Sequence, residues 1–85
     1  MLDINIIRNP KTVKGLAREI INVCDGYWSR KIKEDEAREY MRYWSKYESI
    51  KLFKGDKLNS TVTKIIGKRR TELVNTWLIG TQISI

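Results

Sequence analysis

Apolar residues recur every three or four positions in three stretches of the chain, the spacing that places them along one face of an α-helix. The most regular stretch begins after Asn9 and Pro10, a pair that favours the start of a helix, and continues to about Trp28. Its apolar stripe consists of Val13, Leu16, Ala17, Ile20, Ile21, Cys24, Tyr27 and Trp28. We therefore predict a first helix that ends near Gly26, with Cys24 as a small core residue.

The second stretch predicts a helix over residues 35–48. Three acidic residues at its start suit the positive end of a helix dipole, which explains them better than a pair of catalytic carboxylates does. The residues expected to face inward are Ala37, Tyr40, Met41, Trp44 and Tyr47. The aromatic run that includes Tyr43 suits either a stacking platform for single-stranded bases or a core. Its acidic surroundings favour a core or a protein interface, with Tyr43 as the most exposed ring.

The third stretch, NSTVTKIIGKRRTELVNTWL at residues 59–78, is the one around which the chain is organised. Asn59 and Ser60 are good N-cap residues, and the apolar stripe is broken at Gly67. In one geometry the helix continues through Gly67, at a cost of about 1 kcal/mol relative to alanine. In the other geometry Gly67 is a turn between two short helices. That arrangement is a helix-turn-helix pattern with a basic block at the start of its second helix.

Shorter elements connect and flank these helices. In residues 49–57 we expect Leu52 and Phe53 to anchor a connection to the core and Gly55-Asp56 to form its turn. Residues 2–6 and 82–85 alternate apolar and polar positions, as half-buried strands do. These ends would pair with each other, pair across the axis of a homodimer, or remain disordered.

We predict a mainly α fold: one small domain of three to four helices over residues 1–85. A minor β pairing of the N- and C-terminal segments is one arrangement for the chain ends. Because so small a domain needs every large apolar side chain, Trp28, Trp44 and Trp77 are expected to share one core.

Charge is the strongest global signal. Seventeen basic and ten acidic residues give a net charge of +7, which favours polyanionic partners and nucleic acid above all. Residues 49–85 contain seven basic and two acidic residues, a net +5, whereas residues 34–48 contain three basic and five acidic residues, a net −2. Basic charge is thus segregated, as a polyanion-binding face requires.

Several classes of function are disfavoured by composition. The chain has no histidine and one cysteine, so zinc sites, Cys-His and Ser-His nucleophile pairs and internal disulfides are excluded. We expect no enzymatic activity, no cofactor and no metal. The absence of a signal peptide or a long apolar run disfavours secretion and a membrane partner, and with the lone cysteine it predicts a cytoplasmic protein.

Residues 52–78, LFKGDKLNSTVTKIIGKRRTELVNTWL, resemble the hallmark of a small family found in clostridia and related Firmicutes, often in prophages and other mobile elements. The pieces NPKTVKGLAREI, CDGYW and EDEAREYMRYW resemble its pattern too, so the likeness covers nearly the whole chain. The resemblance implies a context in which small cytoplasmic proteins are often regulators, excision accessories or inhibitors of host proteins. It assigns no functional residue.

The leading hypothesis is a nucleic-acid-associated accessory of a mobile element, acting as a transcriptional regulator or an excisionase-like factor. In the predicted DNA site, phosphates would meet Lys64, Lys68, Arg69 and Arg70, and hydroxyl contacts would come from Thr61 and Thr71. Asn75 would reach a base edge if the second helix enters the major groove. The alternative is a protein-binding module for a recombinase or another protein, with Tyr43, Trp44 or Trp77 as hot spots.

Overall fold

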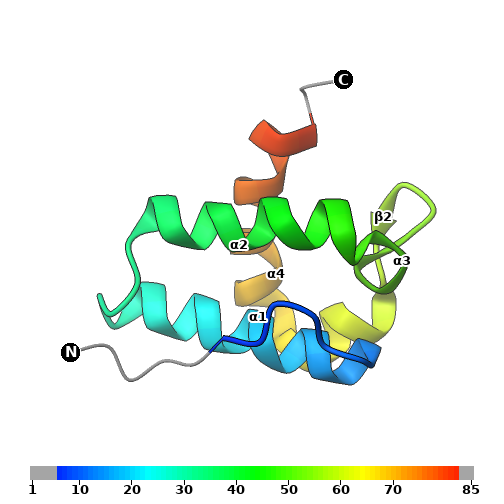
Figure 1. Ribbon diagram of the computed structural model, residues 1–85, viewed down its shortest axis with the longest axis horizontal. Helices are drawn as coiled ribbons and strands as arrows, with labels where there is room; N and C mark the ends of the chain where they lie inside the picture. Colours follow the sequence, from blue (N-terminus) through cyan, green and yellow to red (C-terminus); the bar gives the residue numbers. More distant parts are fainter. Residues whose placement is uncertain (1–5, 83–85) are drawn as a thin grey trace.

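Four helices and one short β-hairpin make up residues 6–82, the part of the chain that the computed structural model describes (Figure 1). In chain order the elements are α1 (Val13–Trp28), α2 (Glu34–Tyr47), α3 (Ser49–Leu52), β1 (Phe53–Lys54), β2 (Lys57–Leu58) and α4 (Ser60–Gln82). Helices α1 and α2 lie side by side at the front of Figure 1, and α4 passes behind them. The predicted mainly helical class is confirmed.

The strand pairing occurs in the middle of the chain. Strands β1 and β2 form an antiparallel hairpin with Phe53 opposite Leu58 and Lys54 opposite Lys57. Gly55 occupies the intervening turn with φ 70°, a left-handed conformation that glycine adopts readily. The predicted terminal strands lie almost entirely outside the described residues. Of those segments the structure describes only Ile6, which is not in a strand, and Gln82, which ends α4.

Helix α1 begins three residues later than the Asn9-Pro10 signal predicts. Its N-cap is Thr12, whose Oγ1 accepts a hydrogen bond from the backbone N–H of Gly15 at 2.9 Å. Asn9 does not cap the helix because its amide is engaged elsewhere: it donates to Glu48 at 2.9 Å and accepts from the hydroxyl of Tyr43 at 3.1 Å. Helix α2, by contrast, lies within one residue of the prediction at each end.

The core lies where α1, α2, α3 and α4 meet. Its largest fully buried side chains are Trp44, Trp77, Leu16, Ile20, Met41, Leu52, Ile66, Leu78, Val23, Val62, Val74 and Cys24. Burial raises the pKa of the Cys24 thiol to about 12, so the thiol is neutral at pH 7. The predictions that Cys24 and Leu52 are core residues are confirmed.

Three predictions about aromatic side chains are wrong. Trp28 is 43 % exposed and stands outside the core, because its neighbour Tyr27 takes the inward position and meets the Trp77 ring edge-on at 5.3 Å. Tyr47, expected inside, is 59 % exposed. Tyr43, expected to be the most exposed ring, is half-buried, and its hydroxyl donates a hydrogen bond to Asn9.

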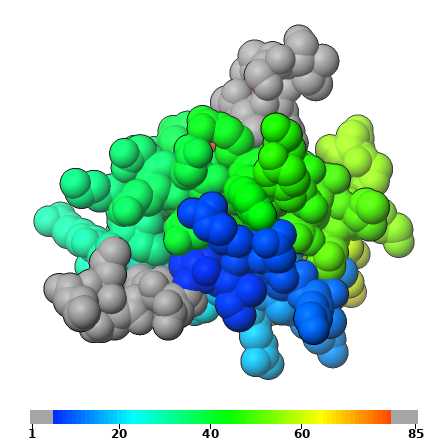
Figure 2. Space-filling view, viewed as in Figure 1, coloured from blue at the N-terminus to red at the C-terminus, as the bar shows by residue number. Residues whose placement is uncertain are grey.

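Residues 6–12, which we call the N-terminal strap, cross from α1 to α2 in front of the core (Figures 1 and 2). The backbone N–H of Ile7 donates to Glu19 of α1 at 3.2 Å. On the other side, the indole N–H of Trp44 donates to the carbonyl of Arg8 at 2.8 Å. The strap therefore joins the two front helices through hydrogen bonds at its backbone.

Glu48, almost buried between α2 and α3, anchors the strap at Asn9. Its carboxylate accepts hydrogen bonds from Lys51 Nζ at 2.7 Å and Asn9 Nδ2 at 2.9 Å, and these bonds lower the pKa of Glu48 below its ordinary value. A lowered pKa in the folded state means that the contribution to stability is complete above the unfolded pKa. It is lost as the pH falls through the folded pKa.

We predict that Glu48→Gln lowers the melting temperature at pH 6–7, because the charged hydrogen bonds are lost. The gap between wild type and variant narrows below pH 4.5, the ordinary pKa of this carboxyl, as the wild-type group becomes protonated. Thermal melts from pH 3 to pH 7 measure both effects. A difference in melting temperature that stays constant from pH 3 to pH 7 contradicts the hydrogen bonds assigned to the charged Glu48 carboxylate.

Candidate nucleic-acid interface

Helix α4 is two helical segments, residues 60–66 and 68–82, joined at Gly67. Gly67 has φ 87° and ψ 169°, a conformation that is essentially restricted to glycine. Figure 1 shows the chain changing direction sharply here, from the yellow segment low in the view to the orange and red segment that rises past α2. Of the two geometries that the sequence allows, the structure has the turn.

Side chains from the second segment satisfy the carbonyl groups at this turn. The hydroxyl of Thr71 donates to the carbonyl of Gly67 at 2.7 Å, and the guanidinium of Arg70 donates to the carbonyl of Ile66 at 3.0 Å. Arg70 also donates two hydrogen bonds to Asp25 of α1, from Nε to Oδ1 at 3.0 Å and from Nη2 to Oδ2 at 3.2 Å. Arg70 and Thr71 are thus engaged within the protein, where they hold the turn against α1.

The remaining predicted cations are free for a partner. Lys64, Lys68 and Arg69 are exposed on either side of Gly67. Within residues 6–82, no carboxylate forms an ion pair with any of the three. They therefore form the electropositive part of the candidate interface, which we call the kink cations.

The other predicted polar residues lie at the edges of this region. Thr61 is exposed, and its backbone N–H donates to Asn59 Oδ1 at 2.9 Å, as expected for a cap at Asn59. Asn75 is exposed one turn beyond Thr71. Both Asn75 and Thr71 line a hollow of about 310 Å³ between the hairpin and α4. The other lining residues are Phe53, Asp56, Lys57, Leu58 and Thr63. Asn75 and Thr71 therefore face this hollow, which none of the kink cations lines.

Sequence reasoning missed the role of Trp28 beside these cations. The guanidinium carbon of Arg69 lies 5.3 Å from the centre of the Trp28 ring, and that of Arg70 lies 5.9 Å from it. Both distances are within the range of cation–π contacts. The CDGYW piece carries no signal for this contact, because its partners are about 40 residues further along the chain.

The face of α2 has the opposite character. Its first turn carries three exposed carboxylates, and Arg38 and Arg42 are already paired with Glu34 and Glu39 at 3.2 and 2.9 Å. A second hollow, of about 280 Å³, is lined by Arg8, Asp35, Glu36, Glu39 and Tyr40. This face is unsuited to a polyanion, since carboxylates repel phosphates.

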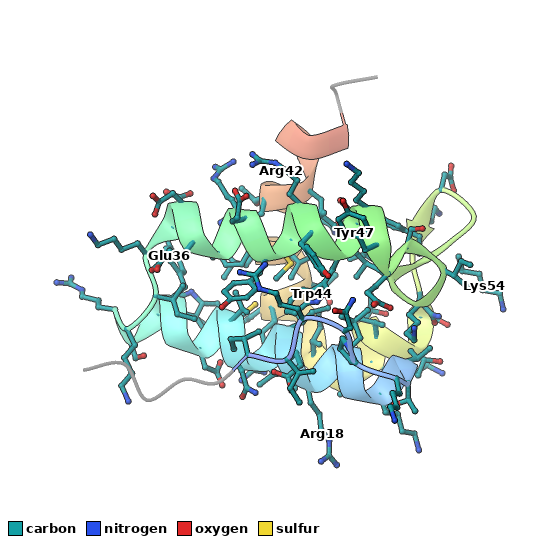
Figure 3. The ribbon with its side chains drawn as sticks, viewed as in Figure 1. Arg18, Glu36, Arg42, Trp44, Tyr47 and Lys54 are labelled. Carbon is teal, nitrogen blue, oxygen red and sulfur yellow. The ribbon has the colours of Figure 1, made fainter. Side chains whose placement is uncertain are left out.

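The residues of the protein-interface alternative divide between surface and core. Trp44 and Trp77 are 0 % and 1 % exposed, so neither side chain is available to a partner in the folded protein. Tyr43 is half-buried, and its ring centre lies 4.7 Å from that of Tyr47, which does reach the surface (Figure 3). Of the aromatic residues predicted or found at this end of α2, Tyr43 and Tyr47 are therefore the ones that a protein partner could contact.

The described residues hold no cluster of three or more His, Cys, Asp or Glu side chains placed to bind a metal ion. None of the helices in residues 6–82 combines the length and the apolar character that crossing a membrane requires.

Together these features define a small α-helical domain with a kinked, basic C-terminal helix and an acidic helix on a separate face. The chain belongs to the family CLB_0814_fam, which is described as a conserved hypothetical protein and whose model matches residues 7–79. The match therefore includes most of the N-terminal strap and the whole turn at Gly67. No curated protein and no solved structure matches the chain.

Proposed function

We propose that this protein is a DNA-associated accessory or regulatory protein of a mobile element, either a transcriptional regulator or an excisionase-like factor. The observation that carries the proposal is the set of kink cations, three exposed and unpaired charges on a helix that turns at Gly67. A turn followed by a basic helical segment is the arrangement with which helix-turn-helix proteins approach DNA. The mobile-element context and a cytoplasmic location rest on the resemblance of residues 52–78 to a clostridial prophage family.

The structure refines which residues would contact phosphate. Arg70 already shares its charge with Asp25, so its contribution to phosphate binding is smaller than that of the kink cations. The hydroxyl of Thr71 is likewise engaged with the carbonyl of Gly67. Thr61 stands in the first turn of α4, three residues before Lys64, where it would add a contact to the sugar–phosphate backbone.

Salt dependence tests the proposal. We expect wild-type protein to bind a fluorescent random duplex in anisotropy titrations, with an affinity that falls steeply between 50 and 200 mM salt. Changing Lys64, Lys68 and Arg69 together to alanine should flatten the slope of log K against log salt by about 2.7, or 0.9 for each lost phosphate contact.

A matched control is available on α2. Changing Arg38, Arg42 and Lys46 to alanine alters the net charge by the same amount on the acidic face. This control should keep a slope close to that of wild type, and circular dichroism checks that both triple variants are folded. No binding by wild type even at low salt, or equal slopes for the two triple variants, would overturn the proposal.

One observation favours protein binding as a second candidate function. Ile50 is 91 % exposed and follows the exposed Tyr47 at the end of α2, so apolar side chains stand at the surface there. Aromatic residues at a surface are frequent anchors of protein interfaces. A recombinase or a host protein would then be the partner. DNA binding at the kink and protein binding here are compatible, because they use different surfaces.

A further inference from the structure

Trp28 is the exposed tryptophan of this chain, and its surroundings are unusual for an exposed apolar ring. The side chain is 43 % exposed, whereas Trp44 and Trp77 are 0 % and 1 % exposed. Two guanidinium groups lie over its ring, those of Arg69 and Arg70. Arg70 is fixed by Asp25, but Arg69 has no ion-pair partner among residues 6–82. One of the two planar cations beside the indole is therefore free to move or to be displaced.

Further basic residues are close in sequence to Trp28 and to Arg69. Arg30 and Lys31 follow Trp28 in the loop after α1, and Lys68 precedes Arg69 at the start of the second segment of α4. All three are exposed and, among the described residues, none is paired with a carboxylate. Phosphates attached to a planar group on the indole would thus meet cations from α4 and from the loop after α1.

We propose that Trp28 and Arg69 form a stacking site for one unpaired base of DNA. This inference rests on the proposed DNA-binding function and adds to it the kind of DNA recognised. Aromatic rings and guanidinium planes both stack on the faces of nucleobases, and this binding tolerates any sequence because every base has a flat face. In a continuous duplex these faces are covered by neighbouring base pairs. The preferred substrate therefore carries an unpaired nucleotide next to the duplex that the kink cations hold.

The test compares three labelled probes. These are a blunt duplex, the same duplex with a short thymidine extension, and the same duplex with an abasic extension of equal length. The abasic extension supplies the same phosphates without bases. We expect wild type to prefer the thymidine extension over the abasic one by about 5- to 150-fold, the range that base–aromatic stacking produces. Quenching of tryptophan fluorescence should accompany binding, since Trp28 is the accessible indole.

Variants separate stacking from charge. Trp28→Ala should abolish the preference for thymidine over abasic probes while leaving the affinity for blunt duplex and its salt slope unchanged. Trp28→Phe keeps an aromatic ring and should keep part of the preference, which guards against misfolding of the alanine variant. Arg69→Lys keeps the charge but not the planar group, so it should reduce the preference with little change in slope. Tyr47→Ala removes an exposed aromatic ring from α2 and should change neither the preference for thymidine over abasic probes nor the salt slope.

The outcomes distinguish this inference from the proposed function. Duplex binding without a preference for thymidine, or a preference that survives in Trp28→Ala, overturns the stacking site and leaves the DNA-binding proposal standing. A wild-type protein that binds none of the three probes overturns both. A preference that disappears only in Trp28→Ala and weakens in Arg69→Lys supports the stacking site.

Discussion

Trp44→Ala is expected to lower the free energy of unfolding by about 3–5 kcal/mol, the usual cost of truncating a fully buried tryptophan. Trp44 is 0 % exposed, and its ring centre lies 5.7 Å from that of Tyr40. Its indole N–H donates a hydrogen bond to the carbonyl of Arg8. The substitution therefore opens a cavity and also leaves the carbonyl of Arg8 without its partner. Small domains are stable by only about 5–15 kcal/mol in total, so the variant would lose a large part of the stability of the fold.

Urea denaturation followed by circular dichroism measures this loss. Tyr47→Ala is the matched control, because Tyr47 lies three residues further along α2 and is 59 % exposed. Its cost should stay within about 0.5 kcal/mol, as is usual for surface positions. A Trp44→Ala variant that denatures like wild type would contradict the core described here and would restore Trp44 as an interface residue.

Gly67→Ala is expected to destabilise the fold by about 1–3 kcal/mol, because a side chain is strained at φ 87° and ψ 169°. The strain comes from the backbone alone, since a Cβ at this position would meet no atom within 4 Å. A D-alanine at position 67, introduced by chemical synthesis, is the matched control. Its preferred backbone conformations are the mirror images of those of L-alanine, so it adopts the observed φ and ψ without that strain.

Denaturation curves of the proteins with glycine, L-alanine and D-alanine at position 67 measure the differences in stability. We expect the order of stability to be L-alanine lowest, with glycine and D-alanine both higher. If L-alanine stabilises the protein instead, the chain prefers a continuous helix through position 67, and the turn described here is wrong. The same variants can be titrated with duplex DNA, which links the geometry at Gly67 to the proposed function.

Local patterns predicted the helices well and their surroundings poorly. The period of the apolar residues located α1 and α2, since burial of one helical face is recorded directly in the spacing. The predicted start of α1 is wrong because Asn9 is a good N-cap by residue type, whereas its side chain is hydrogen-bonded to Glu48 and Tyr43 in the structure. The hairpin was predicted only as a turn at Gly55-Asp56. Strands of two residues are too short to show any alternation.

The candidate site was only partly accessible to sequence reasoning. The basic block at residues 68–70 stands out in the chain, and Gly67 marked a break. Which of these cations are free depends on Asp25, which is 45 residues away from Arg70 and carries no pattern that links the two. Tyr27 packs against Trp77 while Trp28 is exposed, and the apolar stripe does not distinguish the two because both residues belong to it.

The N-terminal strap has a consequence for how the protein folds. Its hydrogen bonds to Glu19, Trp44 and Glu48 span 12, 36 and 39 residues along the chain. Closing loops of that length costs entropy that contacts within a helix do not, so we expect the helices to form early and the strap to dock late. Contacts that form after the transition state affect the rate of unfolding and leave the rate of folding almost unchanged. We therefore expect the strap to slow unfolding, and so to lengthen the time for which a folded molecule persists.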